Sequence, residues 1–244
     1  MNDLKFYSKI KNWDFSMIKS FEETLTNWNL YEILNEKANE ESKILDLGTG
    51  GGEKLLAFFP TCKEILGTDY SIEMVKTANK NLEKSGKKNI SFKAMNNLKM
   101  DTEDEYFDIV VARHTCTNPK QIYKTLKQNG SLLIQGVDKL DCWSLKLLFN
   151  KGQGFNDEKP ISQIDYENVI NAGFTNVELI PIHIREYFET KEDLLALLLK
   201  TPILDEFEIN EVNNSLIDKY IEENKSDKGI LLIRRYYGIT AYKK

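Results

Sequence analysis

The sequence predicts an α/β fold built on a mostly parallel β-sheet that has helices on both of its faces. From Trp28 onward, strand-like segments alternate with helix-like segments, which is the pattern of parallel strands joined by crossover helices. Two of the strand-like segments, 107–112 and 130–136, contain apolar runs without alternation. Such runs are typical of strands that are buried on both faces.

Seven segments are expected to be strands. They are 43–47, 64–69, 89–94, 107–112, 130–136, 176–188 and 229–244. The last two are longer than the others and are separated by about forty mostly helical residues. Pro181 has no amide hydrogen to donate to a neighbouring strand, so 176–188 is expected to be an edge strand.

Two of the intervening helices have clear start signals. Ser71 is expected to cap a helix whose apolar residues Met74, Ala78 and Leu82 fall on one face. Asn118 is followed by Pro119, and proline is favoured at the first helical position because its missing amide would have no partner there.

The whole chain, residues 1–244, is expected to form a single domain, because it contains no internal repeat and no low-complexity linker. Residues 1–42 are expected to form a helical cap at the N-terminus. A helical insertion is expected at about 190–227, over one end of the sheet.

Composition narrows the function classes. The formal net charge is −5, and this acidic balance disfavours tight non-specific binding of nucleic acid. Three scattered cysteines form neither a disulfide framework nor a metal-binding spacing, so no metal is expected and a reducing, cytoplasmic location is favoured. The longest apolar run, Leu194–Leu199, is too short to cross a membrane.

The most informative motif is the stretch ILDLGTGGGEKLL, residues 44–56. It places a glycine-rich turn between a strand and a helix, where bare backbone can approach a ligand closely. A dinucleotide-binding turn has the pattern G-x-G-x-x-G, but here Glu53 stands at the third glycine position and the glycine comes one residue earlier, at Gly52. An oxidoreductase that uses NAD is therefore disfavoured.

The pattern Asp46-x-Gly48-x-Gly50-x-Gly52 resembles the first motif of the class I S-adenosylmethionine (SAM) dependent methyltransferases. Asp69 ends the next strand, and GTDYSIEMVKTANKNL around it resembles the second motif of that family. The phrases NWDFS, VVARHT and LIQGV resemble a bacterial, type 11-like subgroup of these enzymes that has no assigned substrate. The resemblance implies a Rossmann-like, seven-stranded sheet whose last strand is antiparallel, with SAM as cofactor and S-adenosylhomocysteine (SAH) as product.

The resemblance also implies roles for single residues. Asp69 is expected to bind the ribose hydroxyls, Tyr70 to lie against the adenine, and Asp46 to hold the turn in shape. The full set of expected cofactor-binding residues is Asp46, Gly48, Thr49, Gly50, Gly52, Asp69, Tyr70, Met95, Asn96 and Arg113. Ala94 stands where many relatives carry an acid that binds adenine, so the side chain of Asn96 or Asn97, or the Met95 amide, is expected to serve instead.

Methyl transfer needs no fixed catalytic residue, because the reactivity resides in the cofactor. His114 lies in the loop after the fourth strand and is the best candidate for a general base, since histidine titrates near neutral pH. The alternative is that it packs against the cofactor or binds a backbone carbonyl. Residues expected on the acceptor side are Tyr7, Trp13, Phe15 and Tyr187.

The sequence therefore predicts an enzyme that methylates an oxygen or nitrogen atom of a small molecule. The acceptor is expected between the cofactor, the N-terminal cap and the insertion. An RNA or protein methyltransferase and a non-catalytic SAM-binding module remain alternatives. The oligomeric state, monomer or homodimer, stays open.

Overall fold

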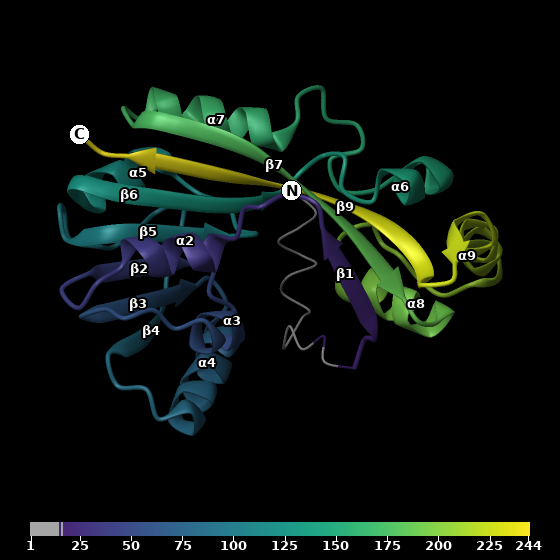
Figure 1. Ribbon diagram of the computed structural model, residues 1–244, viewed down its shortest axis with the longest axis horizontal. Helices are drawn as coiled ribbons and strands as arrows, with labels where there is room; N and C mark the ends of the chain where they lie inside the picture. The colour runs from purple at the N-terminus through teal and green to yellow at the C-terminus, as the bar shows by residue number, and fades with distance from the viewer. Residues whose placement is uncertain (1–14, 16) are drawn as a thin grey trace. The chain divides into compact units, whose positions relative to one another are not determined.

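The computed structural model describes residue 15 and residues 17–244, and it divides into two compact units. The larger unit consists of Trp28–Gly136, Gln163–Ile180 and Tyr237–Lys244. The smaller unit consists of Val137–Ser162, Pro181–Tyr236 and the described residues up to Asn27. Figure 1 labels all helices and strands of both units except β8.

The larger unit is an α/β sheet. Its elements are β2 (Lys43–Leu47), α3 (Glu53–Ala57), β3 (Glu64–Asp69), α4 (Ile72–Ser85), β4 (Ile90–Ala94), β5 (Phe107–Arg113) and α5 (Pro119–Thr125), together with α2 (Leu30–Lys37) and α7 (Ile161–Asn171). Three long strands contribute residues to both units: β6 (Leu126–Val137), β7 (Thr175–Phe188) and β9 (Gly229–Tyr242). Within the larger unit the strand order is β4-β3-β2-β5-β6-β9-β7.

The sheet is parallel from β4 to β6, and β9 is antiparallel to β6. Each neighbouring pair from β4 to β6 is parallel. Lys243 exchanges backbone hydrogen bonds with Asn129 and Gly130 at the start of β6, whereas Tyr237 lies over Gly136 near its end. The arrows in Figure 1 show the same opposed directions. The predicted class, a mostly parallel sheet with an antiparallel last strand, is confirmed.

Both faces of this sheet are covered by apolar side chains and helices. In β2, Leu45 and Leu47 join one buried cluster with residues of α5 and α7, whereas Ile44 joins a second cluster with residues of α2 and α3. The strands β5 and β6 divide their side chains in the same alternating way. Unbroken apolar runs are therefore required, because neither face of these strands meets water.

The predicted caps are present. The Oγ atom of Ser71 accepts a hydrogen bond from the Met74 amide at the start of α4, and Oδ1 of Asn118 accepts one from Gln121 at the start of α5. Pro119 stands at the first turn of α5, as predicted.

All seven predicted strands exist, but the number of strands was wrong: the described residues contain nine. The additional strands are β1 (Ser20–Thr24), which lies within the segment expected to be a helical cap, and the two-residue β8 (Lys225–Ser226), which pairs with β9. Strand β1 pairs antiparallel with Ile184–Phe188 of β7. The edge position predicted for β7 is therefore wrong after Pro181, where β7 lies between β1 and β9. Proline is tolerated because Pro181 lies outside the register with β1.

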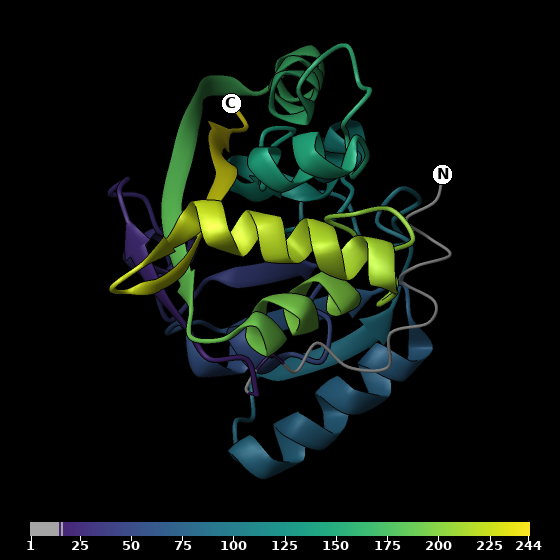
Figure 2. The same ribbon diagram turned by 90° about the vertical axis from the view of Figure 1, so that its right-hand side faces the viewer.

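The smaller unit gathers its helices around its own apolar core. These helices are α6 (Trp143–Phe149), α8 (Lys191–Lys200) and α9 (Glu211–Asn224), the last two lying in the segment expected to be a helical insertion. Figure 2 shows α8 and α9, green and yellow, side by side, and both contribute buried residues to one cluster with Leu145 of α6. Among the described residues, no helix is long and apolar enough to span a bilayer.

Candidate functional site

The glycine turn lies in the larger unit, directly after β2. Gly48 and Gly52 both have a φ angle of 75°, in the left-handed region that favours glycine. The amides of Gly48 and Thr49 both donate to the carbonyl of Thr68 in the neighbouring strand β3, at 2.8 and 2.9 Å. These bonds fix the turn against the carboxyl end of β3.

Asp69, the last residue of β3, also binds the turn, through its carboxylate. One carboxylate oxygen accepts the Gly50 amide at 3.0 Å and the other accepts the Ser71 amide at 2.8 Å. Burial raises the pKa of Asp69, and these two amide bonds act in the opposite direction by stabilising the charged form. Each oxygen receives one of these two amides and has a second lone pair, so the carboxylate is oriented and keeps acceptor capacity. The ring of the next residue, Tyr70, is exposed.

Asp46 is a buried carboxyl group inside the end of β2, with 4% of its surface exposed. Burial raises its pKa to about 7, and the negative charge of Asp69 acts in the same direction. The nearby Thr49 hydroxyl and the Arg113 guanidinium oppose this rise. The Thr49 hydroxyl is itself buried and makes no hydrogen bond that satisfies normal geometry in the described part of the chain.

The segment after β4 was expected to contact the adenine. The Met95 amide donates to the carbonyl of Asp69 at 2.9 Å, so it is not free to serve a ligand. Asn96 accepts the Leu98 amide through its own side chain at 2.9 Å and so closes a local turn. The side chain of Asn97 is instead buried and donates to the Thr115 hydroxyl at 3.0 Å.

The loop after β5 carries the candidate base. His114 adopts a positive φ of 51°, which is unusual for a residue with a side chain, and its amide donates to the carbonyl of Gln135 in β6 at 2.7 Å. The His114 Nε2 lies 3.5 Å from the Gln135 side-chain nitrogen. Which of the two nitrogens donates in this contact depends on the tautomer of the imidazole.

The larger unit thus brings together the turn, Asp46, Asp69, Arg113 and the His114 loop. Residues expected on the acceptor side fall elsewhere: Phe15 and Tyr187 belong to the smaller unit. Phe15 packs against the apolar cluster there, and the buried Tyr187 donates from its hydroxyl to Glu23 at 3.1 Å. Tyr7 and Trp13 lie outside the described residues.

Three residues that contribute to this geometry were not predicted: Thr68, Thr115 and Gln135. Each contacts a segment that is distant in sequence, so no local pattern marks it. Their position in the chain was the one available signal, because all three are polar residues within two residues of the carboxyl end of a strand. Ligands of parallel sheets bind at these ends.

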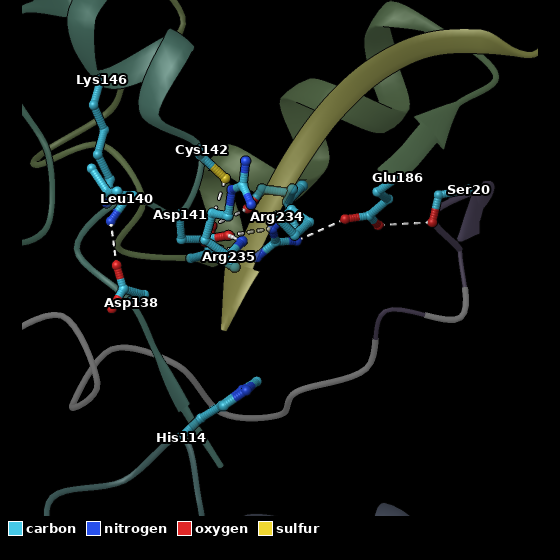
Figure 3. Close-up of polar contacts among 12 residues, drawn as sticks. Ser20, His114, Asp138, Leu140, Asp141, Cys142, Lys146, Glu186, Arg234 and Arg235 are labelled. Carbon is cyan, nitrogen blue, oxygen red and sulfur yellow. Dashed lines mark hydrogen bonds and ion pairs between the residues drawn. The ribbon is translucent and has the colours of Figure 1, made fainter. Parts of the chain in front are cut away.

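The smaller unit contains a different polar cluster, which is buried and fully paired. Figure 3 shows Arg234 between Asp141 and Glu186, with Ser20 bound to the far oxygen of Glu186. Arg234 makes two hydrogen bonds to Asp141, at 3.0 and 3.2 Å, and one to Glu186 at 2.7 Å. This arrangement joins the segment before α6 to β7 and β9, which is a structural role.

A groove of about 550 Å³ lies at the amino ends of β3, β4 and β5. Its lining includes Lys63, Asn89 and Tyr106 but no residue of the glycine turn. Among the described residues, no three His, Cys, Asp or Glu side chains gather to hold a metal ion.

Comparison with known proteins finds relatives of the part of the chain that carries this site. Residues 38–147 match the family model of a methyltransferase domain, and this stretch contains the glycine turn, Asp69 and His114. Residues 38–147 thus contain a methyltransferase domain, and its fold and glycine turn are similar to those of class I, SAM-dependent methyltransferases.

Individual relatives agree with the class. Over 109 residues the chain is 28% identical to YcgJ of Bacillus subtilis, an uncharacterized methyltransferase, and the match covers 42% of this chain and 43% of YcgJ. The YcgJ crystal structure has a TM-score of 0.61 at 17% identity, covering 88% of this chain and 98% of that one.

Two other solved structures share the fold. A SAM-dependent methyltransferase of Aquifex aeolicus has a TM-score of 0.53 at 16% identity, covering 89% of this chain and 90% of that one. Phosphoethanolamine N-methyltransferase 2 of Haemonchus contortus has a TM-score of 0.53 at 20% identity, covering 88% of this chain and 52% of that one.

Proposed function

We propose that this protein transfers a methyl group from SAM to an oxygen or nitrogen atom of a small-molecule acceptor. The observation that carries the proposal is the turn Gly48–Gly52, which presents backbone at the carboxyl end of β2 and is hydrogen-bonded to Asp69. In parallel sheets this is the position at which ligands bind.

The larger unit fits the proposed cofactor. A Cβ atom at Gly48 would lie 2.6 Å from Cβ of Thr115, so only glycine lets the turn and the loop after β5 approach this closely. In this proposal the free lone pairs of Asp69 accept the ribose hydroxyls, the exposed ring of Tyr70 covers the adenine, and the backbone of Gly48–Gly52 faces the methionine moiety.

Asp46, Thr49 and Arg113 form the inner side of the proposed site. The Thr49 hydroxyl lacks a partner of good geometry, and a bound polar group would supply one. Arg113 is close enough to influence the pKa of Asp46, so its positive charge lies near the turn. The Met95 amide is already bonded to Asp69, and Met95 and Asn96 would therefore contact the adenine through packing rather than through that amide.

When bound, SAM supplies a methyl group on a positively charged sulfur that an acceptor atom attacks in line. The protein's own contribution is then alignment, which can lower the barrier by roughly 7–11 kcal/mol. An acceptor that arrives protonated also needs a base, and a positioned base contributes about 10²–10⁴ in rate. His114 is the candidate for this base, and a positioning role is its alternative.

The acceptor class rests on two observations. The chain is acidic, with a net charge of −5, which disfavours RNA as a substrate. The Haemonchus contortus enzyme, which shares the fold, was solved with the small molecule phosphomonomethylethanolamine. Tyr7, Trp13, Phe15 and Tyr187 stay candidates for acceptor contacts, and the single-domain organisation and cytoplasmic location remain part of the proposal.

Calorimetric titration with SAM, SAH and NAD tests cofactor binding. We expect binding of SAM and SAH only, loss of both in Asp69→Ala, and no change in Asp101→Ala, a control carboxylate that is 91% exposed. Binding of NAD alone, or unchanged SAH binding in Asp69→Ala, would refute the proposal.

A screen of methyl acceptors, with SAH release as the readout, tests the reaction. Turnover of small hydroxyl or amine compounds supports the proposal; turnover of RNA or protein alone shows the alternative substrate class. SAH binding without any turnover favours a non-catalytic SAM-binding module. If His114 is the base, His114→Gln lowers kcat by about 10²-fold or more and removes a neutral-pH step from the rate profile.

A further inference from the structure

Three polar side chains from separate strands meet beside the glycine turn. Thr68 is the next-to-last residue of β3, Asn97 follows β4 and Thr115 follows β5. The Thr68 hydroxyl is 3.5 Å from Oδ1 of Asn97, and Nδ2 of Asn97 donates to the Thr115 hydroxyl at 3.0 Å. Thr68 is fully buried and Asn97 is 9% exposed, so water does not compete strongly for these bonds.

Thr115 connects these hydrogen bonds to the glycine turn, because its side chain contacts Gly48. A Cβ atom added to Gly48 would lie 2.6 Å from Cβ and 2.8 Å from Oγ1 of Thr115. The Thr115 side chain therefore rests on the bare backbone of Gly48. Its rotamer is set by the bond from Asn97, because the hydroxyl accepts the Asn97 amide hydrogen.

The neighbouring Asn96 has no such connection. Its side-chain oxygen accepts the Leu98 amide within a local turn. Only the second asparagine of this pair joins the ends of three strands, and nothing in the local sequence distinguishes the two.

We infer that Asn97 is a positioning residue, which holds the loop after β5 against the glycine turn and thereby sets the affinity for the adenosyl cofactor. The inference rests on the proposed function. Without Asn97, the Thr115 side chain loses the group that orients it. A reoriented Thr115 side chain no longer supports the conformation of the Gly48 backbone.

Titration with SAH tests this role in Asn97→Ala, Thr115→Val, the double variant and Thr115→Ser, and urea unfolding measures stability separately. Each of the first two variants is expected to bind SAH about 10-fold more weakly, in line with the loss of one buried hydrogen bond. The double variant is expected to match the single variants, because either change alone breaks the same contact. Thr115→Ser keeps the hydroxyl and should bind within about twofold of wild type, a difference smaller than a typical hydrogen bond.

Asn79→Ala is the matched control, because among the described residues the Asn79 side chain bonds only to Val75 of its own helix. Wild-type SAH affinity in Asn97→Ala and Thr115→Val, or additive losses in the double variant, would overturn the inference while leaving the proposed function intact. Absence of SAH binding by the wild-type protein would overturn both. If Asn97→Ala does not fold, equal affinities of Thr115→Val and Thr115→Ser refute the inference.

Discussion

Replacement of Gly48 by alanine should damage the turn in two ways. Its φ angle of 75° lies in the left-handed region, which costs a residue with a Cβ atom about 1–2 kcal/mol. The new methyl group would also lie 2.6 Å from Cβ of Thr115, and Thr115 is held by its bond to Asn97. Such overpacking adds about 1–3 kcal/mol, so we expect a total loss of about 2–5 kcal/mol in the free energy of unfolding.

Gly86→Ala provides the matched control. Gly86 follows the last residue of α4 and has a similar φ of 68°. Apart from its chain neighbours, no atom of the described residues lies within 4 Å of a Cβ added there. The free energy of unfolding of Gly86→Ala should fall only by the cost of the left-handed φ angle, about 1–2 kcal/mol. Urea unfolding followed by circular dichroism measures both variants, and SAH titration should show a loss of affinity for Gly48→Ala alone. Equal destabilisation of the two variants, or unchanged SAH affinity in Gly48→Ala, would refute the reasoning.

Three further predictions concern charge and accessibility. Arg234→Met leaves the Asp141 carboxylate buried without its paired guanidinium. Urea unfolding should show a free energy of unfolding lower by about 3–5 kcal/mol. A loss below about 1 kcal/mol would contradict a structural role for the Arg234–Asp141 pair. Burial raises the pKa of Asp46 from 3.8 to about 7. Between these values the folded state keeps a proton that the unfolded chain releases. The free energy of unfolding should therefore fall by up to about 4 kcal/mol as the pH rises from about 4 to 7. Asp46→Asn should flatten this fall, and identical pH slopes in both proteins would exclude Asp46 as the cause. Cys116 is exposed and the other two cysteines are buried, so a thiol reagent should modify one thiol rapidly in the native protein and all three in denaturant; three fast reactions would contradict the burial pattern.

The sequence alone was sufficient for the five strands β2 to β6 and for the location of the glycine turn. Both are local properties: unbroken apolar runs predict strands that are buried on two faces, and left-handed φ angles at Gly48 and Gly52 require residues without a Cβ atom. The segment 43–47 and the segment 64–69 were placed with their observed bounds.

Tertiary structure alone decided which polar groups meet. Strand β1 was not predicted, because the exposed segment SFEET acquires its conformation by pairing with β7, far along the chain. The Met95 amide looked available for adenine until the fold placed the carbonyl of Asp69 2.9 Å away. Asn96 and Asn97 are the same residue type in neighbouring positions, yet one closes a local turn and the other joins three strands. Such hydrogen bonds depend on the distance between segments that are remote in sequence, and that distance exists only once the sheet has formed.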